Sequence, residues 1–210
     1  MFPLYDINQA RRPALVVKGL VFANALAFLW QLSVGLEESA YALGFIPALF
    51  FADPLGEGYR LLTSMFLHGS FFHILSNMWF LWVFGDNVED RMGHGRFLLF
   101  YLLGGVAAAL AQGVFTPFSS VPMIGASGAV SAVLGAYYVL FPRAYVVSVL
   151  FILLPFFVTL PASFYLGYWA FLQLLQGLLG LPGVAWWAHL GGFVYGVLLA
   201  PRLAWRWRRW

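Results

Sequence analysis

The chain has 210 residues, of which 62% are hydrophobic and 9% charged, whereas an average soluble domain is about 45–50% apolar and about 25% charged. This composition excludes a water-soluble globular fold and predicts an integral membrane protein. The net charge of +3 comes mostly from arginines near the chain ends, and cysteine is absent, so we expect no nucleic-acid partner and no thiolate metal site.

Six apolar segments, each with at most one charged residue, are long enough to cross a bilayer, for which a helix needs about 17–25 residues. With the N-terminus in the cytoplasm, six spans place ten of the eleven lysines and arginines on the inner side, as the positive-inside rule requires. We therefore predict an all-α, six-transmembrane-helix bundle with both termini cytoplasmic, formed by residues 1–210 as one domain in the plasma membrane. The predicted spans cover residues 14–34, 62–85, 96–116, 125–141, 162–181 and 187–203.

The first apolar run follows Arg11, Arg12 and Lys18 and has no clean small-residue cleavage signal, so we interpret it as a retained first helix. The loop that follows, residues 35–60, is acidic and belongs on the outer side. Its middle, residues 45–51, is too apolar for free water, and we expect it to lie partly in the outer leaflet.

A further apolar run at residues 144–160 contains Pro155. A proline removes one helix donor, and a crossing here would move the C-terminal arginines to the outer side, against the charge rule. We interpret this run as an interfacial or re-entrant connection. The last span is flanked by residues typical of membrane interfaces, namely Trp186, Trp187, Trp205, Trp207, Trp210, Arg202, Arg206, Arg208 and Arg209.

Several polar side chains fall inside the predicted spans, where ionisable groups are functional candidates. The second, fourth and sixth spans all run from the outside inward. Their N-terminal ends therefore lie on the same side, and His73, Asn77, Ser127 and His189 are predicted at a similar shallow depth on the extracytoplasmic side.

The types of these residues suit nucleophilic catalysis, which needs an activated hydroxyl, a base and donors for an oxyanion. Ser127 falls in the first turn of a predicted helix, where free N–H groups and the helix dipole favour negative charge. His189 is the candidate base. Gly125 and Gly128 are expected to let the backbone approach a substrate carbonyl closely.

Two side chains of the second span are candidate oxyanion donors. His73 and Asn77 are four residues apart, hence on one helical face, and both can donate a hydrogen bond. No acidic residue follows Asp90, and the acids near it belong to the inner side. We therefore predict a Ser–His dyad without a carboxylate.

Small residues recur at every fourth position along the fourth and sixth spans. Such stripes allow close backbone contact between membrane helices, which would bring His189 against Ser127. Taken alone, such stripes more often reflect generic helix packing. The two stripes are Ser127, Ser131 and Gly135, and Gly192, Gly196 and Ala200.

Four stretches resemble the rhomboid intramembrane proteases in order and spacing: Tyr59-Arg60, His68-x4-His73-x3-Asn77, Gly125-Ala126-Ser127-Gly128 and His189-x2-Gly192-x3-Gly196. The resemblance implies that Ser127 is the nucleophile and His189 its general base. It implies an oxyanion hole formed by His73, Asn77 and the backbone N–H of Ser127. His68 and Arg60 would be structural residues of the outer half. The implied activity is cleavage of a peptide bond in or near a transmembrane helix of another membrane protein, without metal or cofactor.

Two positions depart from the family pattern. Tyr59 stands where many members carry tryptophan. Ser131 stands where some members carry an aromatic residue that stacks on the catalytic histidine, which leaves open how the ring of His189 is held.

Two other functions remain as alternatives. One is a catalytically inactive rhomboid-like protein that binds membrane clients, although such a protein normally lacks the serine or the histidine. The other is an unrelated carrier, for which acidic residues at mid-membrane and repeat symmetry would be typical.

Overall fold

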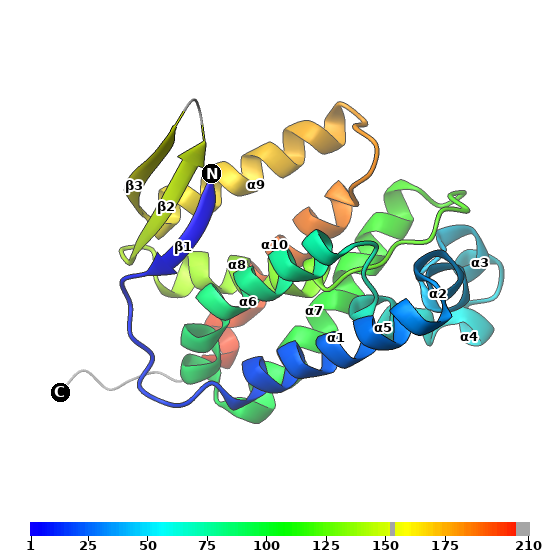
Figure 1. Cartoon of the computed structure of the whole chain (residues 1–210), viewed down its shortest axis with the longest axis horizontal. Coiled ribbons are helices and arrows are strands. Elements are labelled where there is room, and N and C mark those ends of the chain that lie inside the picture. Colours follow the sequence, from blue (N-terminus) through cyan, green and yellow to red (C-terminus); the bar gives the residue numbers. More distant parts are fainter. Residues whose placement is uncertain (152–153, 205–210) are drawn as a thin grey trace.

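Long helices make up most of the fold. A computed structural model describes residues 1–151 and 154–204 of the chain (Figure 1). The long helices are α1 (Leu15–Val34), α6 (Phe71–Met92), α7 (His94–Phe115), α8 (Ser127–Leu140), α9 (Ala162–Leu178) and α10 (Trp186–Leu203). Between α1 and α6 lie α2 (Leu36–Leu43), α3 (Pro47–Ala52), α4 (Pro54–Glu57), α5 (Arg60–Thr63) and the 3-10 helix η1 (Ser64–Phe66).

The six long helices coincide with the six predicted spans, but the ends of the second differ from the prediction. Helix α6 begins at Phe71 instead of residue 62, because the Ser70 side chain caps it by accepting a hydrogen bond from the N–H of His73. It continues to Met92, and Gly93 ends it with a positive φ of 78°. His68 therefore precedes the helix.

The described residues of the run at 144–160 do not form a helix, which agrees with the prediction that this run does not span the membrane, but their extended conformation was not predicted. They contain strands β2 (Tyr145–Phe151) and β3 (Pro155–Pro161), which pair antiparallel in an unbroken register. Strand β1 (Phe2–Asp6) adds to β2 to complete a three-stranded sheet. The prediction of an all-α fold was therefore wrong, and the fold is mostly helical. Valine, phenylalanine and tyrosine dominate β2 and β3, and such residues favour strands.

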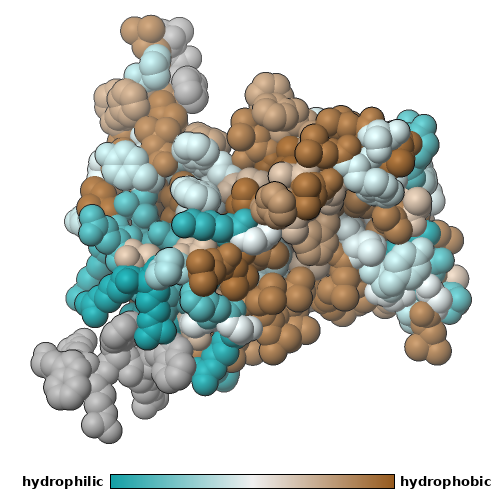
Figure 2. Space-filling model, turned by 60° about the horizontal axis from the view of Figure 1, so that its bottom comes forward, coloured by the Kyte–Doolittle hydropathy of each residue, from teal (hydrophilic) through white to brown (hydrophobic). Residues whose placement is uncertain are grey.

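The sheet and the short helices α2 to α4 lie at opposite ends of the molecule (Figure 1). On the face drawn in Figure 2, hydrophobic side chains gather in the middle and hydrophilic ones toward both ends. Among the described helices, α1 and α7 are long and apolar enough to cross a membrane, and α8 is a shorter apolar helix. The C-terminal tryptophans and arginines predicted as an interfacial anchor, at positions 205–210, lie outside the described residues.

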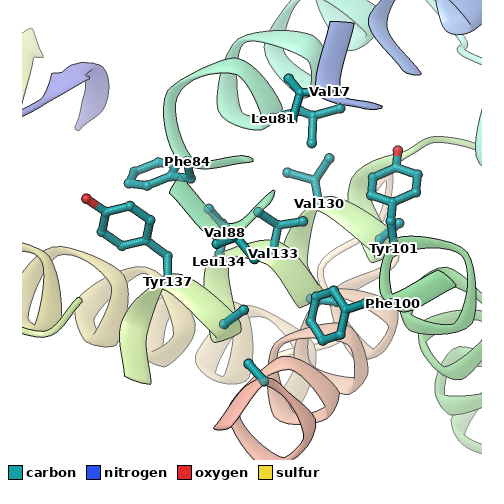
Figure 3. Packing of buried hydrophobic residues seen from close by; sticks show 14 of the residues in the cluster. Val17, Leu81, Phe84, Val88, Phe100, Tyr101, Val130, Val133, Leu134 and Tyr137 are labelled. Carbon is teal, nitrogen blue, oxygen red and sulfur yellow. The ribbon is translucent and has the colours of Figure 1, made fainter. Parts of the chain in front are cut away.

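Helix α8 occupies the centre of the bundle. All of its residues from Gly128 to Tyr137 are buried. Figure 3 shows Val130, Val133 and Leu134 among side chains of α1, α6 and α7. Because it is surrounded by other helices, α8 presents its first turn to the interior of the protein.

At the end of the bundle that carries the sheet, a buried carboxylate connects α6 to the start of α1. Glu89 on α6 is 1% exposed, and its two oxygens accept hydrogen bonds from the N–H groups of Val16 (2.8 Å) and Val17 (2.9 Å) at the start of α1. This contact satisfies free donors at a helix N-terminus with a negative charge.

The carboxylate of Asp6 links strand β1 to two helices. It accepts hydrogen bonds from the Tyr137 hydroxyl of α8 and from Asn87 Nδ2 of α6, the latter at 2.9 Å. Burial raises the pKa of Asp6 to about 6, opposed by the hydrogen bond from Tyr137 and reinforced by the charge of Asp86. Ionisation of Asp6 is therefore less favourable in the folded protein than in the unfolded chain.

We predict that Asp6 makes the protein more stable as the pH falls from 7 to 4. Its folded pKa of about 6 lies above the ordinary value of 3.8, so the ionised carboxylate destabilises the fold above pH 6, and this penalty disappears as the group is protonated. The thermal unfolding midpoint in detergent should rise over this range in the wild type. It should rise less in Asp6→Asn, whereas the exposed control Glu37→Gln should behave like the wild type; an unchanged pH dependence in Asp6→Asn would contradict the prediction.

Candidate active site

Helices α8 and α10 are in direct backbone contact, as the stripes of small residues predict. A Cβ atom added to Gly192 would lie 2.1 Å from the carbonyl oxygen of Gly128, and one added to Gly196 would lie 2.0 Å from that of Ala132. One added to Gly135 would lie 2.0 Å from the carbonyl oxygen of Phe193. These spacings leave no room for a side chain, so the glycines set the distance between the two helices.

A cavity of about 600 Å³ lies where α6, α8, α9 and α10 meet. Its lining includes His73 and Asn77 of α6, Ser127 of α8 and His189 of α10, together with Trp169 of α9. The structure therefore brings the four sequence-predicted polar residues to one cavity, although they come from three separate helices.

The turn before α8 orients Ser127. Gly125 has a φ of 122°, which an L-residue rarely adopts, and its N–H donates to the carbonyl oxygen of Ser64 at 2.9 Å. A Cβ atom at Gly125 would lie 2.8 Å from His73 Nε2 and 3.6 Å from Ser127 Oγ. Both side chains thus face the space beside Gly125, and Ser127 begins α8, whose first N–H groups have no intrahelical acceptor.

His73 and Asn77 each retain a donor. The Nδ1 atom of His73 accepts from the N–H of Gly69 at 3.3 Å, so in the neutral ring the proton resides on Nε2, the atom nearest Gly125. Asn77 Nδ2 donates one of its two hydrogens to the carbonyl oxygen of His73 at 2.8 Å. Its second hydrogen is left for another acceptor.

The ring of His189 is held from α9, which the sequence did not indicate. Its Nδ1 atom lies 2.7 Å from Oε1 of Gln173, and the ring packs 6.0 Å from that of Trp169, between centroids. Ser131, which stands at the position that is aromatic in some rhomboids, does not fill this role. Its hydroxyl donates to the backbone oxygen of Ser127 at 2.6 Å. Gln173 is the site residue that sequence reasoning missed, and its only signal was an amide in a predicted span.

The start of α10 is fixed by a second glutamine. The Oε1 atom of Gln112 on α7 accepts from the N–H of Ala188 at 3.2 Å. The rings of Trp187 and Phe115 stack at 3.9 Å between centroids. These contacts position the turn that carries His189.

Arg60 and His68 are buried side chains of the segment between α1 and α6. The guanidinium of Arg60 donates to the carbonyl oxygens of Tyr41 (2.8 Å) and Gly44 (3.1 Å) and pairs with Glu57. It thereby connects the short helices that follow α1. The His68 side chain is fully buried, and its ring contacts that of His73 at 5.0 Å between centroids.

Gly128 does not face the space where a substrate could bind, contrary to the expectation from sequence. A Cβ atom added there would lie 2.6 Å from the Cβ atom of Ala108 on α7. Its missing side chain therefore permits α7 and α8 to pack, and a close approach of the substrate to the backbone stays a prediction for Gly125.

The chain was compared with families of known proteins. The model of the rhomboid domain matches residues 55–206, which is more than half of the chain. The chain belongs to the rhomboid family. Rhomboids are integral membrane proteins, so the apolar composition and the long helices have a common explanation. The matched region includes the four cavity residues predicted from the sequence, His73, Asn77, Ser127 and His189.

Relatives of this rhomboid occur in bacteria and in animals. It is 46% identical over 81 residues to the "Rhomboid protease GluP" of Bacillus subtilis, covering 39% of this chain and 15% of that protein. It is 30% identical over 185 residues to the "Presenilin-associated rhomboid-like protein, mitochondrial" of Mus musculus, covering 86% of this chain and 46% of that protein. The chain thus spans less than half the length of either relative.

We predict that Gly192→Ala destabilises the protein by roughly 1–3 kcal/mol, the usual cost of overpacking a close-packed interior. The added methyl group would meet the backbone of α8, which cannot move aside as a flexible side chain could. The thermal unfolding midpoint in detergent should fall. Gly19→Ala is the matched control, because a Cβ atom there has nothing within 4 Å; equal midpoints for the two variants would mean that α8 and α10 are not in contact.

Proposed function

We propose that this rhomboid is an intramembrane serine endopeptidase that cleaves peptide bonds in or near transmembrane segments of other membrane proteins. The observation that carries the proposal is the shared cavity, which a serine at a helix N-terminus, a histidine and two further donors line together. Two of the relatives, those of Bacillus subtilis, are named as a rhomboid protease and a putative rhomboid protease.

In the proposed mechanism, Ser127 Oγ attacks the scissile carbonyl while His189 Nε2 removes its proton. The tetrahedral oxyanion accepts hydrogen bonds from the N–H of Ser127, from His73 Nε2–H and from Asn77 Nδ2–H. His189 then returns the proton to the leaving amine, and an acyl-enzyme forms on Ser127. Water, deprotonated by His189, hydrolyses this ester and regenerates the serine. No metal or cofactor takes part.

We further propose that six helices, α1, α6, α7, α8, α9 and α10, cross the cell membrane, with both termini and the sheet on the cytoplasmic side. The hydrophobic middle of the face in Figure 2 supports this arrangement. So does the distribution of lysine and arginine under the positive-inside rule. The cavity then opens toward the extracytoplasmic half of the bilayer, where a substrate helix can be unwound.

The principal prediction is that Ser127→Ala and His189→Ala each abolish cleavage of a transmembrane substrate and covalent labelling by a fluorophosphonate probe in detergent. Each variant removes a group that reacts directly, so the loss should exceed a thousandfold. The matched controls are Ser120→Ala, on an exposed loop, and His94→Ala, at the other end of the bundle. If the wild-type protein folds and binds membrane clients but is never labelled by the probe, it is the catalytically inactive rhomboid-like protein and the prediction is wrong.

The proposed topology makes a separate prediction. Reporters placed near Glu57, Ser119 and Gly183 should be accessible from outside, and a reporter near Arg91 should be cytoplasmic. Position 183 decides the matter, because the serine and the histidine must lie on one side of a hydrocarbon core about 30 Å thick. Cytoplasmic labelling at 183 combined with external labelling at 119 is the result that this topology forbids.

A further inference from the structure

The contact between α9 and the ring of His189 has a chemical direction. Gln173 is only 7% exposed, and its Oε1 atom lies 2.7 Å from His189 Nδ1. An amide oxygen carries no proton and can only accept. With Oε1 facing the ring, the contact is a hydrogen bond when Nδ1 holds the ring proton, and this tautomer leaves the lone pair on Nε2.

We propose that Gln173 is a positioning residue that fixes the tautomer and the orientation of the His189 ring. The proposal rests on the proposed function, in which Nε2 of His189 takes the proton of Ser127. It gives this chain an Oε1 acceptor at the place where a triad would have a carboxylate. Gln173 does not line the cavity that contains Ser127, and in this proposal it acts only through the histidine.

The surroundings explain why the acceptor is an amide. His189 and Gln173 meet between helices of an apolar bundle, and no aspartate or glutamate follows Asp90 in the sequence. An ionised carboxylate buried without a partner would destabilise the fold strongly. A neutral amide can orient the ring without adding a charge that must be desolvated.

A second contact of α9 restricts the same ring. Trp169 lies four residues before Gln173, hence on the same face of the helix, and its ring is inclined by 31° to that of His189. The hydrogen bond sets the rotation of the imidazole, and the indole limits its tilt. Together they hold the histidine ring, as the aromatic residue at the position of Ser131 does in some rhomboids.

The tautomer can be measured without any substrate. With only four histidines in the chain, selective ¹⁵N-histidine labelling in detergent micelles gives a tractable spectrum, and subtraction of the His189→Ala spectrum assigns the ring of interest. The wild type should show the Nδ1–H form of the neutral ring. Gln173→Met should show a mixture of both tautomers. A wild-type ring protonated on Nε2, or a Gln173→Met spectrum identical to the wild type, overturns the proposal.

Kinetics test the consequence for catalysis. Gln173→Met keeps the length of the side chain but removes the hydrogen-bond acceptor. We expect kcat to fall roughly tenfold with KM unchanged, because a misoriented base loses only part of the rate enhancement that general-base catalysis supplies. The rate of fluorophosphonate labelling should fall by the same factor. Gln176→Met, on the same helix, is the control and should match the wild type.

Gln173→Glu distinguishes positioning from packing. Its carboxylate accepts the same proton and stabilises the protonated ring, so labelling should recover toward the wild-type rate at high pH while the acidic limb of the pH profile moves to higher pH. Equal losses in both variants, with no change in the pH profile, would mean that Gln173 merely packs. If the wild type is not labelled at all, the proposed function fails, and the spectrum still decides whether Gln173 sets the tautomer.

Discussion

The contact between the backbones of α8 and α10 determines the rest of the site. Ser127 and His189 belong to different helices, and the distance between them depends on how closely these helices approach. Glycines at 135, 192 and 196 remove the side chains that would hold the helices apart. Since lipid surrounds such helices with chains as apolar as their own side chains, close packing is a principal source of their association. The glycines therefore act on stability and on the geometry of the site together.

Around this fixed pair, the other groups of the cavity reach their places by hydrogen bonds to neighbouring helices or to their own. Asn77 donates a hydrogen bond to the backbone of His73 within α6, and the turn before Ser127 donates one to Ser64. The start of α10 donates one to Gln112. Each of these hydrogen bonds leaves a donor or a nucleophile directed toward the cavity. Such preorganisation matters because donors that are already oriented need no rearrangement as charge develops on a reacting oxygen.

Sequence reasoning recovered the helices and the polar residues of the cavity because hydropathy and spacing are local properties. It failed where the outcome depended on distant partners. The start of α6 was misjudged because the apolar residues before Ser70 continue the hydropathy of the helix. Strand β1 was not foreseen because its partner lies about 140 residues away. Gln173 was missed because its contact with His189 depends on the rotation of α9, and Gly128 was misassigned because its open side faces α7.

The sheet imposes an order on assembly. Strand β1 is made before β2 during synthesis, and β2 is its partner in the sheet, to which β3 then adds at the other edge. Its first residues must therefore remain unpaired while four long helices are produced, since contacts distant in sequence form only after the intervening chain exists. When Asp6 reaches Tyr137 and Asn87, strand β1 closes over the ends of α6 and α8, which are already in place. Strand β1, which is made before these helices, is thus among the last segments to find its strand partner.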